Sequence, residues 1–244
     1  MKTAKPRVKM LDILRGAAVL GMVLHHALVS YEIVFDTSVE ILYTAAFAAV
    51  QLLFVAVFLI ISGICTHYSK NVLKRGVIVF LAGMLLTVAT CYVLPAFEIY
   101  GLNIYFGILH MFGLSMILYA LLQKLFKKIP APVGIVLFTL CFIAYYVFYI
   151  GGPTSDSWLL LPFGFIPNAM EYYGDYYPLL PFFFLFLVGT YIGNYVKQNE
   201  FPSWFYNANC PPLEFCGKYS LYVYVLHQPI IFPLMILLYN LKSL

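Results

Sequence analysis

Charged and imidazole side chains interrupt an apolar stretch near the N-terminus, LDILRGAAVLGMVLHHA, at Asp12, Arg15, His25 and His26. An imidazole takes up and releases a proton near neutral pH more readily than other side chains. A guanidinium is suited to hold phosphate or carboxylate groups. Such groups are costly in a segment that crosses lipid, and there they usually serve a function. The stretch therefore predicts a site for group transfer or for transport.

The spacing of these residues on a helix separates the two adjacent histidines. Arg15 and His26 are eleven positions apart, so they differ by only about 20° and lie roughly 16 Å from each other on one face. His25 points about 80° away from this line, and Asp12, one turn before Arg15, is within reach of an ion pair. We expect His26 to share the face of Arg15. The alternative is a structural Asp12–Arg15 pair and a packed, hydrogen-bonded His26.

Two further histidines lie in other apolar runs. His110 stands in YFGILHMFGLS, between two glycines that allow close helix approach, and His227 stands in GKYSLYVYVLHQPII, followed by Gln228 and Pro229. A proline inside a helix frees a backbone carbonyl and bends the helix. Three apolar runs with one such histidine each, in a nearly charge-free background, predict that the three converge on one site.

The elements that must position these residues are membrane-spanning helices. Of the 244 residues, 63% are hydrophobic and only 10% are charged, and the mean hydropathy is +0.91. Soluble proteins carry about 25% charged residues, and membrane β-barrels lack long apolar runs. We therefore expect an all-α polytopic bundle of about seven spans, with room for extra half-spans in the loops. The expected spans are 10–30, 41–65, 76–97, 99–123, 129–155, 176–196 and 219–241.

The charges sort by loop. If the spans alternate in direction, one side carries Lys2, Lys5, Arg7, Lys9, Lys70, Lys74, Arg75, Lys124, Lys127, Lys128, Lys197 and Lys218. The other side carries Glu32, Asp36, Glu40, Glu98, Asp156, Glu171 and Asp175, with Lys242 as the basic exception. Basic loops face the cytoplasm, so we expect a cytoplasmic N-terminus. The net charge of +4 then reflects topology, and no nucleic-acid partner is expected.

No fixed-period repeat divides the chain, which predicts one integral membrane domain over residues 1–244. The long outer loop 151–177 is rich in aromatic residues, among them Trp158 and Tyr176. These residues form either an interfacial aromatic belt or a platform for a sugar. Of the five cysteines, Cys65, Cys91 and Cys141 lie in or beside spans, and the spacing of Cys210 and Cys216 matches no standard zinc pattern, so no metal is expected.

Five motifs in order, LDILRGAAVLGMVLHH, LIISGIC, FGILHMFGLS, DYYPLLPFFFLFLVGTYIGN and GKYSLYVYVLHQPII, together resemble the bacterial branch of the heparan-α-glucosaminide N-acetyltransferase catalytic-domain family. Arg15 with His26 is also similar to the Arg-x10-His pattern of membrane acyltransferases that decorate surface polysaccharides. Animal members resemble the chain at Arg15 but have Asn in place of His26 and a histidine in the following loop, where this chain has none before His67.

The resemblance implies a transmembrane acyltransferase of the bacterial cytoplasmic membrane and suggests a homodimer. It would move an acyl group, most simply acetyl, from cytoplasmic acyl-CoA to a glycan or amino sugar on the other side. His26 would act as general base or as a transiently acylated nucleophile. His110, His227 or Gln228 would orient the base or polarise the thioester carbonyl.

The remaining candidates are expected to bind the substrates. Those for the CoA phosphates are Asp12, Arg15, Lys74 and Arg75, and those for the acceptor are Trp158, Asp175 and Tyr176. Two rival functions stay open at this point. One is a permease or flippase for a polar lipid or sugar, since intramembrane Arg and His also mark transport paths. The other is a scaffolding membrane subunit, which would leave the polar residues unexplained.

Overall fold

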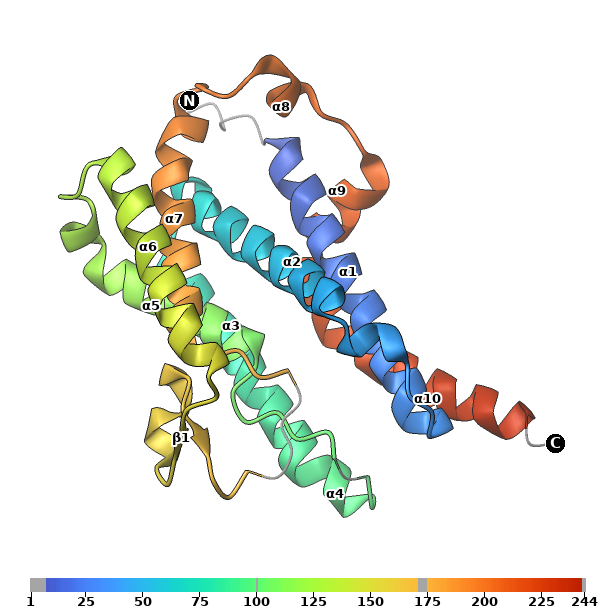
Figure 1. Cartoon of the computed structure of the whole chain (residues 1–244). Helices are drawn as coiled ribbons and strands as arrows, with labels where there is room; N and C mark the ends of the chain where they lie inside the picture. The colour runs from blue at the N-terminus through green and yellow to red at the C-terminus, as the bar shows by residue number, and fades with distance from the viewer. Residues whose placement is uncertain (1–7, 100, 171–174, 243–244) are drawn as a thin grey trace. The chain divides into compact units, whose positions relative to one another are not determined.

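Seven helices of the computed structural model, which describes residues 8–99, 101–170 and 175–242, are long and apolar enough to cross a membrane (Figure 1). These candidate spans are Lys9–Phe35, Ala45–Tyr68, Val72–Ala96, Ile108–Phe126, Ala131–Ile150, Leu179–Lys197 and Ser220–Leu241. The prediction of an all-helical integral membrane protein with about seven spans is confirmed. The predicted loop charges at Lys2, Lys5, Arg7 and Glu171 lie outside the described residues.

The helices are joined by short irregular elements. In chain order the structure has α1 (Lys9–Phe35), η1 (Glu40–Tyr43), α2 (Ala45–Ile64), η2 (Cys65–Tyr68), α3 (Val72–Val88), η3 (Ala89–Val93), α4 (Leu94–Ala96), α5 (Ile108–Phe126), α6 (Ala131–Ile150), β1 (Thr154–Ser155), η4 (Trp158–Phe163), β2 (Ile166–Pro167), α7 (Leu179–Lys197), α8 (Ser203–Asn207), α9 (Pro211–Lys218) and α10 (Ser220–Lys242). Strands β1 and β2 form a two-residue parallel pair within the loop between α6 and α7.

The chain divides into two compact units. One joins Met1–Ile61 to Asn199–Leu244, and the other is Ser62–Gln198. The first unit holds α1, α9 and α10, and the second holds α3, α5, α6 and α7. A single domain over residues 1–244 stays a prediction.

In the first unit the backbones of α1 and α9 are in direct contact. A Cβ atom added to Gly217 of α9 would fall on the backbone carbonyl of Asp12, and one added to Gly16 of α1 would fall on the carbonyl of Leu213. Only glycine allows two helices to approach this closely, because any side chain would hold the axes apart.

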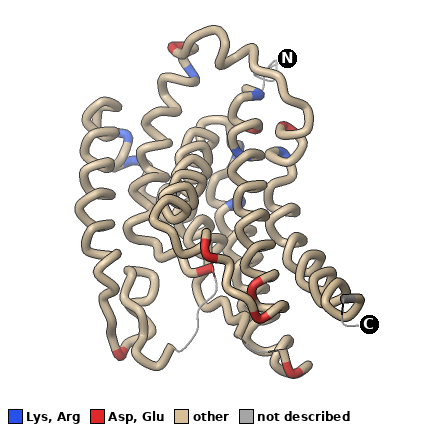
Figure 2. Tube along the Cα trace, turned by 45° about the vertical axis from the view of Figure 1, so that its right-hand side comes forward, with Lys and Arg blue, Asp and Glu red and all other residues tan. Residues whose placement is uncertain are grey.

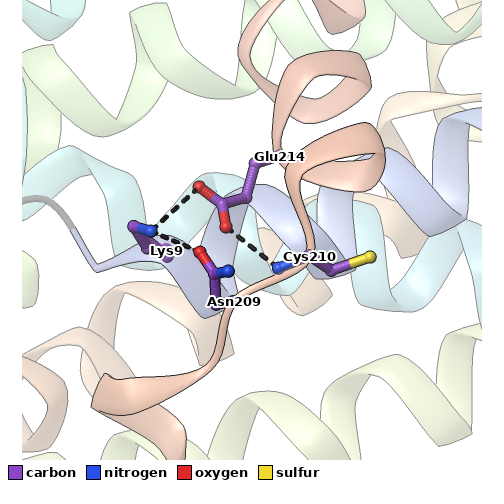
Figure 3. Close-up of polar contacts among 4 residues, drawn as sticks. All are labelled: Lys9, Asn209, Cys210 and Glu214. Carbon is purple, nitrogen blue, oxygen red and sulfur yellow. Dashed lines mark hydrogen bonds and ion pairs between the residues drawn. The ribbon is translucent and has the colours of Figure 1, made fainter.

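A polar cluster joins the N-terminus of α1 to the segment before α9 (Figure 3). Lys9 Nζ donates to Asn209 Oδ1 at 2.5 Å and lies 3.7 Å from Glu214 Oε2. Glu214 Oε1 in turn accepts the backbone N–H of Cys210 at 3.0 Å, which satisfies a donor at the start of α9 that the helix leaves unpaired. The cluster fixes α9 where its two glycine contacts with α1 are made.

A Gly217→Val variant is expected to lose at least about 2 kcal/mol of stability, because the new side chain must force α9 away from the Asp12 carbonyl. The melting temperature of the purified protein in detergent measures the effect. Lys218→Val, a change of the exposed next residue, is the matched control and should stay within about 0.5 kcal/mol of the wild type. Equal melting temperatures for Gly217→Val and the control would show that the α1–α9 contact adds little.

The second unit is built around α7, most of whose residues are buried. Helix α3 packs on α5, and α6 and α5 pack on α7. Small residues again permit close approach: a Cβ atom on Gly113 of α5 would lie 2.5 Å from the backbone nitrogen of Phe80 in α3. The prediction that the glycine after His110 allows helix contact is thus realised against α3.

One expected span begins later than its apolar run. Residues 99–123 were expected to be helical, but α5 begins at Ile108. The preceding segment instead bonds to side chains of the α3 region: Ile104 N donates to Thr90 Oγ1 at 3.1 Å, and Ile104 O accepts from Thr87 Oγ1 at 2.8 Å. Apolar composition does not distinguish such a packed irregular segment from a helix.

Charges within the second unit separate by end (Figure 2). Its described Lys and Arg residues, Lys70, Lys74, Arg75, Lys124, Lys127, Lys128 and Lys197, lie at helix ends and connections of one side. Its described acids, Glu98, Asp156 and Asp175, lie in the opposite connections. This is the distribution that alternating spans produce, and we refer to the two sides as the basic end and the acidic end.

Candidate functional site

Two of the predicted histidines meet in the first unit. The ring of His26, from α1, lies with its centroid 5.0 Å from that of His227, from α10, at an interplanar angle of 59°. Helices α1 and α10 pack against each other along this stretch. His227 is 8% exposed. The predicted convergence of these two spans is therefore present in the structure, and we call His26 and His227 the histidine pair.

The hydrogen bonds of His227 define which of its nitrogens is open. Nδ1 contacts the backbone carbonyl of Tyr224, and because a carbonyl only accepts, Nδ1 carries the hydrogen. In the neutral ring the lone pair is then on Nε2. This atom is buried and has no hydrogen-bond partner among the described residues. A buried polar atom without a partner is costly, which marks His227 as a candidate functional residue.

The adjacent histidines point to different helices, as their spacing predicts. The His25 ring lies 5.6 Å from that of Phe47 in α2, whereas the His26 ring faces His227. The ring centroids of His25 and His26 are 5.2 Å apart in an edge-to-face arrangement. His25 is thus packed beside an aromatic ring, and His26 is the histidine of α1 that joins the pair.

A hydrogen bond joins α1 to α10 next to the pair. Ser30 Oγ donates to Gln228 Oε1 at 3.1 Å, and Gln228 directly follows His227. Ser30 was not among the residues predicted from the sequence. Its position could have indicated it, because a residue four after His26 lies on the same helix face.

Asp12 and Arg15 form the expected ion pair. Arg15 Nη1 lies 3.2 Å from Asp12 Oδ1 and 3.5 Å from the backbone carbonyl of Gly217. Both side chains are largely buried: that of Arg15 is 13% exposed and that of Asp12 is 9% exposed. The guanidinium thus belongs to the α1–α9 contact, about 16 Å along α1 from His26.

His110 lies in the second unit, where both of its ring nitrogens are engaged. Nδ1 accepts the backbone N–H of Gly107 at 3.1 Å. Nε2 lies 3.1 Å from Thr87 Oγ1, and since the Thr87 hydroxyl donates to Ile104 O, Nε2 is the donor. The ring is 2% exposed. These bonds tie the start of α5 to α3, so proton exchange at His110 would require breaking one of them. Thr87 was not singled out by its sequence.

The other predicted binding residues also belong to the second unit. Lys74 and Arg75 are exposed at the start of α3, at its basic end. Asp175 Oδ2 accepts from the backbone N–H of Ile108 at 3.3 Å, which caps α5 at the acidic end. Near it, the Tyr176 hydroxyl donates to Leu161 O at 2.7 Å.

Trp158 is the most solvent-accessible of the predicted acceptor residues, at 45% exposed. Its ring lies 5.1 Å from that of Tyr105. Within the described part of the chain, no group of three or more His, Cys, Asp or Glu residues is placed to hold a metal ion. Among the described residues singled out for acyl or proton transfer, the histidine pair includes a buried ring nitrogen without a hydrogen-bond partner, Nε2 of His227.

Comparison with known protein families shows which family the chain resembles over nearly its whole length. Residues 7–229 match the family described as heparan-alpha-glucosaminide N-acetyltransferase, catalytic. No curated protein and no solved structure matches the chain. The family match covers nearly the whole chain and both units, including α1 with His26 and α10 up to Pro229. The chain therefore belongs to the heparan-alpha-glucosaminide N-acetyltransferase catalytic family and is an integral membrane protein of that acetyltransferase class.

Proposed function

We propose that the protein transfers an acetyl group from acetyl-CoA, or a related acyl-CoA, on the basic side of the membrane to a hydroxyl or amine of a sugar or glycan on the other side. The observation that carries the proposal is the open Nε2 of His227 beside His26, in a chain of an N-acetyltransferase family. Family membership also favours chemistry over the permease or flippase alternative.

The proposed chemistry is base-assisted attack on a thioester. His26 takes the proton of the acceptor hydroxyl or amine as the acceptor oxygen or nitrogen bonds to the acyl carbon. The C–S bond of acyl-CoA then breaks, and the proton passes from the imidazolium to the departing thiolate. Nε2 of His227 carries a second lone pair that could accept a proton within the histidine pair. A transient acyl group on a histidine nitrogen is the variant mechanism.

The donor is proposed to bind from the basic end. Arg15 would meet CoA phosphates. Lys74 and Arg75, which belong to the other unit, stay candidates for the same role from their place in the sequence. Asp12 would keep the guanidinium oriented through the pair at 3.2 Å. Because CoA has a long pantetheine arm, the distance of about 16 Å between Arg15 and His26 suits a donor whose phosphates and thioester lie far apart.

The acceptor is proposed to approach from the acidic end. Asp175 and Tyr176 would bind sugar hydroxyls, and the exposed Trp158 would stack on a sugar ring. Membrane lipid surrounds the protein. A homodimer and a location in a bacterial cytoplasmic membrane are further parts of the proposal, which rest on the sequence resemblance.

The proposal is tested with the purified chain in detergent. Radiolabelled acetyl-CoA is incubated with an amino sugar or with a neutral sugar, and both labelled acetylated sugar and free CoA thiol are measured. We expect the two products in equal amounts, because each transfer releases one thiol. The absence of product with amine and hydroxyl acceptors alike would contradict the proposal.

A second measurement, of CoA binding, does not depend on the choice of acceptor. CoA is titrated against the wild type and against Arg15→Ala, with melting temperature as the check on folding and a nucleotide without pantetheine as the ligand control. Weaker CoA binding by Arg15→Ala, by about tenfold, is expected. Equal affinities would remove Arg15 from the donor site while leaving the transfer activity to be judged by its products.

A further inference from the structure

Ser30 uses its hydroxyl in a way that is uncommon for a serine in an apolar helix. It is 2% exposed, so its hydroxyl needs a partner inside the protein. The usual partner is a carbonyl one turn back in the same helix, as for Ser115, which donates to Met111 O at 2.7 Å. Ser30 instead donates to Gln228 Oε1 on α10 at 3.1 Å. Its hydrogen bond therefore orients a side chain of another helix.

The bond determines which end of the Gln228 amide is available to a ligand. Because Oε1 accepts from Ser30, the NH2 group is the part of Gln228 that can donate elsewhere. Glutamine has three rotatable side-chain bonds, and fixing its amide at one atom removes much of that freedom before a ligand binds. Gln228 follows His227, whose Nε2 is an open acceptor. Ser30 lies one turn after His26 on the same face of α1, so its bond holds the Gln228 amide against the stretch of α1 that also faces His227.

We propose that Ser30 is a positioning residue of the transfer reaction, whose hydroxyl holds Gln228 so that the amide NH2 donates to the thioester carbonyl oxygen. The inference rests on the proposed acetyl transfer. As the acceptor atom bonds to the acyl carbon, the carbonyl electron pair moves onto the oxygen, where an N–H donor stabilises the negative charge. When the C–S bond breaks, that pair re-forms the carbonyl, and the proton held by the imidazole goes to the CoA thiolate.

A purely structural role for the same bond makes a different prediction. Hydrogen bonds between membrane helices contribute little to stability on average. If Ser30 only ties α1 to α10, its loss would lower the melting temperature slightly and leave turnover unchanged. A positioning role instead lowers kcat while leaving the KM for acetyl-CoA close to that of the wild type, because the donor stabilises charge that develops only in the transition state.

The test compares Ser30→Ala, Gln228→Leu and the double variant in the acetyl-transfer assay, with melting temperature and CoA affinity measured for each. Loss of the amide donor should lower kcat by about 10²–10³-fold. Misplacing it should lower kcat by roughly 10–100-fold. The double variant should be no slower than Gln228→Leu, since Ser30 acts through Gln228. Ser30→Thr, which keeps the hydroxyl, should recover most of the rate, and Ser115→Ala is the matched control with unchanged kcat.

The outcomes separate the two proposals. An active wild type with full kcat in Ser30→Ala, or with additive losses in the double variant, overturns the positioning role and leaves the proposed function intact. A wild type that binds CoA but yields no acetylated product overturns both. The positioning role is supported if kcat falls in both single variants and the losses are not additive in the double variant. CoA affinity must then stay unchanged, and Ser30→Thr must recover most of the rate.

Discussion

A His26→Ala variant is expected to lose acetyl transfer by about 10²–10⁴-fold, the usual contribution of a positioned base, whereas His25→Ala keeps most of its activity. The physical reason is direction: the His26 ring faces His227 of α10, and the His25 ring packs on Phe47 of α2. The rate of transfer from radiolabelled acetyl-CoA measures the effect. Melting temperature and CoA affinity must stay near those of the wild type for the loss to be assigned to chemistry.

A variant of His227, the other member of the histidine pair, tests the same prediction a second time. In His227→Asn the amide nitrogen takes a position similar to that of Nδ1, so it can still donate to the Tyr224 carbonyl, while the open Nε2 is removed. We expect this variant to fold, to bind CoA and to lose most of its transfer rate. An inactive His25→Ala together with an active His26→Ala would show that the helical-face argument is wrong.

Acetyl label is expected to cross the membrane while the CoA moiety stays behind. The described Lys and Arg residues of the second unit lie at one end of its helices, and its described Asp and Glu residues lie at the other (Figure 2). If basic loops face the cytoplasm, a donor rich in phosphate meets the basic end, and an acceptor outside meets the acidic one. The measurement uses proteoliposomes of known orientation, with radiolabelled acetyl-CoA on the Lys-rich side only.

A membrane-impermeant amino sugar is then supplied on either side. The expected result is labelled product only when the sugar is on the side opposite to acetyl-CoA. The His26→Ala proteoliposomes report leakage and spontaneous acetylation, and should give no product in either arrangement. Product only when both substrates share the Lys-rich side would contradict transfer across the membrane, even with a fully active enzyme.

The class of protein and the number of spans could be predicted from the chain alone. Long apolar runs in a chain with 10% charged residues leave helices as the structure that satisfies backbone groups in lipid. Where such a run begins and ends was less predictable. The run at 99–123 contained a non-helical part before Ile108, because Thr87 and Thr90 of neighbouring elements satisfy the backbone of Ile104, and composition does not reveal partners distant in sequence.

Within the candidate site, helical periodicity was enough to separate His26 from His25 and to pair Asp12 with Arg15, since both depend on spacing within one helix. It was not enough to say which atoms each histidine contacts. His227 lies beside His26, while His110 lies in the other unit with both ring nitrogens bonded to protein atoms. Ser30, an ordinary residue in the sequence, acquires its part through a bond to Gln228, almost two hundred positions away. Contacts within a helix follow from a fixed rotation and rise, whereas contacts between helices depend on how whole elements pack, and that information is spread over the entire chain.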